Sequence, residues 1–217
     1  RQLEDISTKV NRSNHVKIIA ASKTRSFQEI IDVYNAGINH IGENRIQEAD
    51  KKFESFDSMP NITRRFIGHL QTNKVNKCLD LFDTIDSVDS LKLAKKINNR
   101  SSFLNKKTSI LLEINTSGDE SKKGFPPNLD DDFYSIFGLD NLKVDGLMTM
   151  GPLSQKENET RSAFALLRKI KTKINDQLPC EPIKELSMGM SGDFQIGIEG
   201  GSTMIRLGTA IFGKRNY

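Results

Sequence analysis

The strongest constraint on the fold is an alternation of short, β-branched apolar runs with amphipathic segments along the chain. The runs expected to form strands cover residues 17–22, 40–42, 64–68, 82–86, 109–115, 143–149, 184–189 and 202–208. Parallel neighbours in a sheet need a crossover connection, so repeated strand–helix units predict a parallel sheet. Eight units predict an α/β fold, a closed (β/α)8 TIM barrel, in which each strand but the last has a helix behind it.

An open doubly wound sheet is the structural rival of the barrel. Such folds carry a glycine fingerprint after the first strand, and "ASKTRS" (21–26) contains no glycine. The fifth run, "SILLEIN" (109–115), is nearly all apolar, as expected of a strand covered on both faces. No linker or low-complexity segment interrupts the pattern, so residues 1–217 are expected to form a single domain.

Local signals mark where helices begin. Ser26 followed by Glu29 three residues later is a capping box, and it predicts a helix start directly after the first strand. Behind the fourth strand, Val88, Leu91 and Ile97 are spaced as expected for one face of a helix.

Composition narrows the class of protein. Hydrophobic residues make up 36% and charged residues 28% of the 217 positions, which is ordinary for a soluble globular protein. No apolar run approaches the roughly 18–20 residues of a membrane helix. The first ten residues, "RQLEDISTKV", lack the apolar segment of a signal peptide. We therefore expect a cytoplasmic protein with no membrane partner.

The cysteines, histidines and basic residues give no sign of a metal or nucleic-acid site. Cys78 and Cys180 stand in unrelated segments, as do His15, His40 and His69, so we expect reduced thiols and no metal. The net charge is +4, and the densest basic stretch, "NKVNKC", lacks aromatic residues for base stacking. The positive balance would still help to attract a phosphorylated small molecule.

Two strand ends carry candidate ligand-binding groups. The active face of such a barrel lies at the carboxyl ends of its strands, where Lys23 follows the first strand. Partial desolvation would lower the pKa of this amine and free it for Schiff-base formation, whereas a lysine that turns into solvent is the plain alternative. Glu43 and Asn44 end the second strand and are candidates to hydrogen-bond a ligand, although Asn44 equally fits a helix cap.

The strongest functional signal is a pair of glycine- and hydroxyl-rich turns, "SMGMSGD" (187–193) and "RLGTA" (206–210), after strands seven and eight. Loops at these places form the usual phosphate site of such barrels. Small residues let backbone N–H groups approach a phosphate, and the hydroxyls of Ser191 and Thr209 can donate as well. Arg206 should point into the same site, where its partner is either a ligand or a barrel carboxylate such as Glu113.

A lysine at the rim, a phosphate site and an arginine between them suit pyridoxal 5′-phosphate. The stretches "SKT", "GENRIQE", "FIGHLQTNK", "INTSGDESKKGF", "GLMTMGP", "SMGMSGDF" and "IRLGTAIFG" resemble the pyridoxal phosphate homeostasis protein family. Its fold is like the N-terminal barrel of alanine racemase, a fold type III pyridoxal phosphate protein. The resemblance spans about Lys17 to Gly213, nearly the whole chain.

By this resemblance, Lys23 carries the cofactor covalently as an internal aldimine and Asn44 lies beside the cofactor ring. Arg206 lies at the pyridine nitrogen, and the phosphate is surrounded by Ser191, Gly208 and Thr209. Two departures from the family pattern stand out, and neither residue touches a proposed ligand. Ser26 stands where a proline is common, and Gly197 stands where alanine is usual.

Three functions are compatible with these residues. A racemase of low activity would need a second base, which in alanine racemase comes from a C-terminal β-domain, and only four residues follow Gly213. A class I aldolase would more usually carry its lysine on a later strand. We therefore expect a monomeric protein that is not an enzyme and that holds pyridoxal phosphate for intracellular vitamin B6 homeostasis. Pyridoxal-dependent apoenzymes are its candidate partners.

Overall fold

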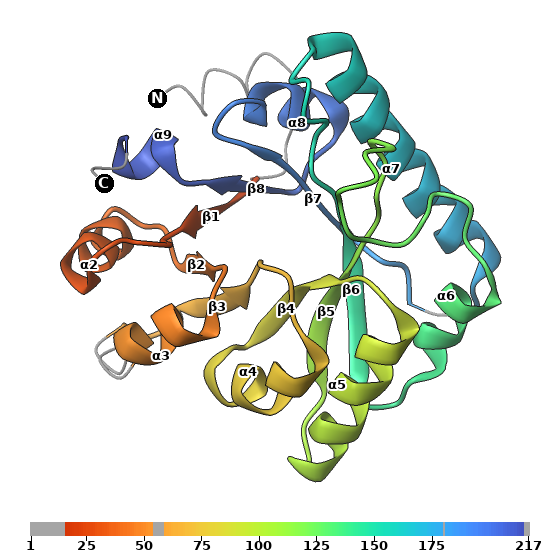
Figure 1. Ribbon diagram of the computed structural model, residues 1–217, viewed down its shortest axis with the longest axis horizontal. Helices are drawn as coiled ribbons and strands as arrows, with labels where there is room; N and C mark the ends of the chain where they lie inside the picture. Colours follow the sequence, from red (N-terminus) through yellow and green to blue (C-terminus); the bar gives the residue numbers. More distant parts are fainter. Residues whose placement is uncertain (1–15, 54–58, 180, 215–217) are drawn as a thin grey trace.

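The structure of the chain, a computed structural model, describes residues 16–53, 59–179 and 181–214. Parallel strands close a barrel in the order β1-β2-β3-β4-β5-β6-β7-β8, and β8 pairs with β1 (Figure 1). The strands are β1 (Lys17–Ala21), β2 (His40–Glu43), β3 (Thr63–Phe66), β4 (Thr84–Val88), β5 (Thr108–Glu113), β6 (Leu142–Met148), β7 (Glu185–Met190) and β8 (Met204–Leu207). The predicted (β/α)8 barrel is confirmed, and the open doubly wound sheet is excluded.

Helices form a layer outside the strands (Figure 1). They are α2 (Phe27–Asn35), α3 (Ile46–Phe53), α4 (Val75–Leu81), α5 (Leu91–Phe103), α6 (Asp131–Ser135), α7 (Glu157–Gln177), α8 (Phe194–Gly200) and α9 (Thr209–Phe212), with single 3-10 turns η2 (Thr72–Lys74) and η3 (Ile136–Gly138). The capping box before α2 is confirmed, because the Ser26 hydroxyl accepts from the Glu29 N–H and the Glu29 carboxylate accepts from the Ser26 N–H.

Two expectations about element boundaries are wrong. Val88 is the last residue of β4, and α5 begins at Leu91 after the N-cap Ser90. Apolar residues three apart fit one helix face or a strand end followed by a helix, so spacing alone did not separate the two. The last strand also has a helix behind it, since α9 follows β8.

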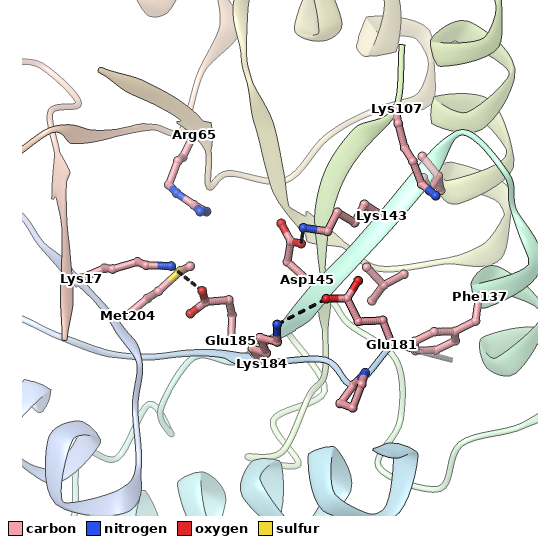
Figure 2. Close-up of a pocket in the computed structure, with 13 residues that line it drawn as sticks. Lys17, Arg65, Lys107, Phe137, Lys143, Asp145, Glu181, Lys184, Glu185 and Met204 are labelled. Carbon is pink, nitrogen blue, oxygen red and sulfur yellow. Dashed lines mark hydrogen bonds and ion pairs between the residues drawn. The ribbon is translucent and has the colours of Figure 1, made fainter. Parts of the chain in front are cut away.

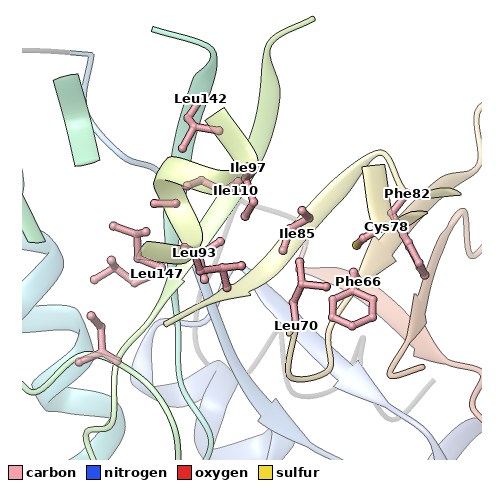
Figure 3. Packing of buried hydrophobic residues seen from close by; sticks show 14 of the residues in the cluster. Phe66, Leu70, Cys78, Phe82, Ile85, Leu93, Ile97, Ile110, Leu142 and Leu147 are labelled. Carbon is pink, nitrogen blue, oxygen red and sulfur yellow. The ribbon is translucent and has the colours of Figure 1, made fainter. Parts of the chain in front are cut away.

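Apolar side chains pack on both sides of the strands, as the alternation of side chains along a strand requires, and Ile198, Ile205 and Leu207 form a small separate cluster beside α8 and β8. A small cluster of Ile19, Leu111, Met148 and Met204 fills the inside of the barrel. The larger core lies between the strands and the helices, and Figure 3 shows part of it around α4 and α5. Cys78 is buried there as a free thiol, and burial raises the pKa of that thiol.

Several residues on which predictions from the sequence rest lie outside the described ranges. The first ten residues, His15 and Cys180 are among them. Within the described ranges, no helix is long and apolar enough to cross a membrane. In the same part of the chain, no group of three or more histidine, cysteine, aspartate or glutamate residues is arranged to hold a metal ion.

Candidate functional site

The two turns predicted to bind a phosphate lie in direct contact at the carboxyl end of the barrel. The hydroxyl oxygen of Ser191, in the turn after β7, accepts hydrogen bonds from two backbone N–H groups of the turn after β8. The Ser191 Oγ lies 3.1 Å from the nitrogen of Gly208 and 3.2 Å from that of Ala210. Two amide donors from one turn and a hydroxyl from the other therefore converge at one point.

Glycine residues make the turn after β7 possible. Gly189 has a φ of 101°, in the left-handed region that favours glycine. Gly197, in α8, packs so closely on β7 that an added Cβ would lie 2.8 Å from the carbonyl oxygen of Met188. The N–H of Asp193 donates to the carbonyl of Met190 at 3.0 Å and closes the turn. Close packing of α8 on β7 thus fixes residues 190–193 at the rim.

The register of β8 against β1 brings the phosphate turns to the end of the first strand. Leu207 pairs with Ala20, so Gly208 follows next to Ala21. A Cβ added to Gly208 would lie 3.6 Å from the carbonyl oxygen of Ala21. The glycine turn after β8 therefore lies beside the segment that carries Lys23.

Lys23 lies in a tight turn just past β1 and is half-buried, unlike the fully solvated lysine of the plain alternative. The N–H of Ser22 still donates to the carbonyl of Gly42 at 3.0 Å, which continues the pairing with β2. The N–H of Arg25 then donates to the carbonyl of Ser22 at 3.0 Å, and Thr24 has a φ of 63°, which is rare for a β-branched residue. This sharp reversal holds Lys23 at the rim.

A buried network that the sequence did not predict anchors the same strand end. Glu43 Oε1 accepts hydrogen bonds from the Ser22 hydroxyl and from the Lys52 ammonium, both at 2.7 Å, and Lys52 also donates to the Ser22 carbonyl at 2.8 Å. Burial raises the pKa of Glu43, and the bond from Lys52 opposes that shift. Glu43 therefore faces α3, and its expected role as a ligand-binding group is not supported. The signal was available, since Glu43 shares its strand face with the core residue Ile41.

Asn44 follows β2 at the same rim and is half-buried. Its alternative role as a helix cap is wrong, because α3 begins at Ile46 and Asn44 lies one residue too early. The backbone beside it is tightly packed, since a Cβ on Gly68 would lie 2.2 Å from the carbonyl oxygen of Asn44. The glycine after β3 therefore allows the β2 and β3 ends to approach each other.

Arg206 is buried inside the barrel, 5% exposed, and neutral oxygen atoms hold its guanidinium. Nη1 donates to the carbonyl and the hydroxyl of Ser187 at 2.8 and 2.7 Å, and Nη2 donates to the carbonyl of Thr149 at 2.7 Å. Burial lowers the pKa of Arg206, while the charges of Asp86, Glu113 and Asp193 oppose this shift.

The barrel carboxylate considered as the partner of Arg206 does not contact it. Among the described residues, no ion pair joins Glu113 to Arg206. Burial and the nearby charge of Asp89 raise the pKa of Glu113 to about 7, and Arg206 lowers it only in part. The barrel therefore encloses an acid that titrates near neutral pH. His69 lies at the same end of the barrel, with its Nδ1 3.2 Å from Asp89.

The last predicted residue, Thr209, is exposed at the start of α9, directly after Gly208. The fold thus brings the ends of β1, β2, β7 and β8 to one rim, with Lys23, Asn44, Ser191, Gly208 and Thr209 on them and Arg206 beneath. The functional groups at this rim are an amine, a side-chain amide, hydroxyl and backbone N–H donors, and a buried guanidinium beneath them.

Known proteins are similar to this chain in sequence and fold. The family model for the N-terminal domain of alanine racemase matches residues 2–216. A pyridoxal phosphate homeostasis protein of Aquifex aeolicus is 38% identical over 222 residues, which cover 100% of this chain and 96% of the relative. One from Synechocystis is 41% identical over 201 residues, 92% of each chain. The structure of PipY from Synechococcus elongatus with PLP bound is 32% identical and superposes with a TM-score of 0.83, covering 98% of this chain and 100% of PipY.

Proposed function

The chain belongs to the family of pyridoxal phosphate homeostasis proteins, and from this premise we propose that it binds pyridoxal 5′-phosphate at the carboxyl end of its barrel and helps to maintain the cellular supply of that cofactor. PipY, whose structure contains PLP, shares the fold over nearly its whole length. The observation that carries the proposal is the convergence of Ser191 with the N–H groups of Gly208 and Ala210.

These groups fit a phosphate. Both backbone N–H groups point at one oxygen atom, the Ser191 hydroxyl, and a phosphate oxygen is a stronger acceptor of the same kind. The Ser191 hydroxyl can itself donate to phosphate, and the exposed Thr209 hydroxyl adds a second donor at the start of α9. Charge-assisted hydrogen bonds of this type are roughly twice as strong as neutral ones.

The remaining rim residues fit the rest of the cofactor. Pyridoxal phosphate supplies an aldehyde, which a neutral primary amine can bind covalently and reversibly with release of water. We propose Lys23 as that amine, since the strand pairing places its turn beside Gly208. Asn44 at the neighbouring strand end would contact the ring, and Arg206 would face the ring nitrogen.

The same residues favour binding over catalysis. A guanidinium is effectively always protonated, so Arg206 beside the ring nitrogen disfavours a proton there. A ring without that proton withdraws electrons weakly, which disfavours racemisation. The relatives' names state homeostasis and no reaction. We propose that the protein holds the reactive aldehyde and releases it to competing amines, with pyridoxal-dependent apoenzymes as recipients.

Reconstitution with pyridoxal phosphate tests this function. We expect a yellow protein whose visible absorption is fixed by borohydride reduction, with the label on the peptide that contains Lys23. Pyridoxal, which lacks the phosphate, should be retained much less well. A colourless protein, or label spread over surface lysines, would contradict the proposal, and rapid racemisation of alanine by the pure protein would make it an enzyme.

A further inference from the structure

A polar cavity lies at the end of the barrel where the strands begin, opposite the proposed cofactor site. It has a volume of about 390 Å³, which is within the range of small-molecule sites. Its walls come from the amino ends of strands, with Lys17 on β1, Arg65 on β3, Lys143 on β6, Glu185 on β7 and Met204 on β8. Figure 2 shows these side chains around the cavity, and we call it the amino-end cavity.

The amino-end cavity carries an excess of positive charge. Five cationic and three acidic side chains line it. Each acid already has its own lysine, and these pairs are Glu185 with Lys17, Asp145 with Lys143 at 3.0 Å, and Glu181 with Lys184 at 3.3 Å. Arg65 pairs with Asp86, which is not among the lining residues, so Lys107 is the lining cation that no carboxylate of the described residues neutralises.

Arg65 is a buried arginine whose donors are only partly used. It is 5% exposed, and its Nη1 donates to both carboxylate oxygens of Asp86 at 2.9 and 2.8 Å. Its Nε is buried and has no hydrogen-bond partner. A buried donor left without a partner costs about 1–3 kcal/mol, so native structures almost always supply one. The guanidinium points into the cavity (Figure 2).

Two further polar groups lie at this end of the barrel. Lys107 also lines the cavity, and within the described part of the chain no carboxylate pairs with it. His40 has a buried Nδ1 with no hydrogen-bond partner. Burial and the charges of Arg65 and Lys17 lower the pKa of His40 to about 4, so its ring is neutral and adds no charge.

We infer that the amino-end cavity is a second ligand site, for a small anion that carries a phosphate or carboxylate groups. Donors of Arg65 that do not contact Asp86 can bind such an oxyanion, and Lys107 supplies a cation that no described carboxylate neutralises. Phe137, Leu142 and Val144 line the same cavity and give an apolar wall for a carbon skeleton. The site is independent of the proposed cofactor site, which lies at the other end of the strands.

Nuclear magnetic resonance can test the inference, because the two ends of the barrel report separately. Backbone amide shifts would be followed while the full chain is titrated with inorganic phosphate, with succinate, or with sodium chloride at matched ionic strength. We expect saturable shifts at the starts of β1, β3, β6 and β7 with phosphate, succinate or both, and none with chloride. The effective probe shows whether the site prefers a phosphate or a dicarboxylate. Amide shifts that phosphate causes at residues 191–192 and 208–210 report binding at the proposed cofactor site.

Matched variants complete the test. Lys107→Glu should weaken binding at the amino end about tenfold, and Arg65→Lys should weaken it similarly while keeping a cation for Asp86. Lys95→Glu, an exposed lysine of α5 outside the cavity, should leave binding unchanged. No saturable shifts at the amino end, equal shifts with chloride, or binding that survives both cavity variants would overturn the inference and leave a cavity filled by water.

Discussion

The hydroxyl oxygen of Ser191 lies 3.1 Å from the backbone nitrogen of Gly208, so the turn after β7 is hydrogen-bonded to the turn after β8. A second bond, from Ala210 to the same oxygen, fixes the direction of both amides. The pair therefore arranges hydrogen-bond donors around one point before any ligand arrives, and such preorganisation lowers the cost of binding.

Replacing Ser191 by alanine should weaken binding of pyridoxal phosphate by about 1.5–3 kcal/mol, because it removes a hydrogen bond to a charged group. An absorbance titration measures the affinity. Binding of pyridoxal, which has no phosphate, should change little. Ser102→Ala, an exposed serine on α5, is the matched control. Equal losses for both ligands would show that Ser191 supports the fold of the rim and does not contact the phosphate.

Lys23→Ala should abolish covalent attachment of the cofactor and leave the fold intact. The side chain is half-buried in a rim turn and belongs to none of the apolar clusters, so its loss removes little packing. Borohydride reduction followed by mass spectrometry of the intact protein checks the attachment, and circular dichroism checks the fold. Lys95→Ala should retain the full label. Label on another lysine in the Lys23→Ala protein would move the attachment site elsewhere.

Arg206→Met should lower the free energy of unfolding by about 2–4 kcal/mol. The change leaves the buried carbonyl of Thr149 and the hydroxyl of Ser187 without the Arg206 donor, whereas the Ser187 carbonyl keeps its bond from the Thr149 N–H at 3.1 Å. Urea unfolding measures the effect. Arg168→Met is the control, since Arg168 is exposed and donates to the Gly200 carbonyl at 3.3 Å. This variant should lower the free energy of unfolding by no more than about 1 kcal/mol. Similar small effects for both variants would mean that water replaces the buried guanidinium.

Glu113→Gln should make stability less dependent on pH. Burial raises the pKa of Glu113 to about 7 from an ordinary value of 4.5, so the folded state binds a proton more tightly than the unfolded state. The contribution of protonated Glu113 to the free energy of unfolding is fully present below pH 4.5 and is lost as the pH rises through 7. As the pH rises from 5 to 8, the free energy of unfolding of the variant should increase by roughly 1–3 kcal/mol relative to that of the wild type.

Urea unfolding at several pH values measures the difference in the free energy of unfolding between Glu113→Gln and the wild type. The lowered pKa of His40, about 4, has the opposite sign and reduces stability as pH falls below 6.5. That contribution is common to both proteins and cancels. A difference that stays constant with pH would place the pKa of Glu113 near its ordinary value.

Gly197→Ala should destabilise the protein although alanine is the better helix former by about 1 kcal/mol. The new Cβ would lie 2.8 Å from the Met188 carbonyl oxygen and 3.1 Å from the Gly189 Cα, so α8 would have to move away from β7. The same movement would disturb the turn of Ser191 and weaken pyridoxal phosphate binding. Gly138→Ala, with no atom within 4 Å of its Cβ, is the control in a thermal melt. A more stable Gly197→Ala protein would show that α8 shifts at little cost.

The sequence by itself determined the architecture and the rim. Strand and helix periods are local properties, so eight apolar runs with helical segments between them predicted the barrel in the correct order. Because parallel strands share one carboxyl end, the positions of Lys23, Asn44, Ser191 and Gly208 after their strands already predicted that they lie at one rim of the barrel. The same local reasoning failed at Val88, where spacing fits a strand end as well as a helix.

Only the tertiary structure decided which groups touch. Arg206 bonds to Thr149, 57 residues earlier, and Lys52 of α3 bonds to Ser22 after β1 and to Glu43 at the end of β2. Such contacts depend on the register of the strands and on closure of β8 against β1, which no local pattern specifies. The Nε donor of Arg65 that has no hydrogen-bond partner is a further example, because such a donor is recognised only when every neighbour has been placed.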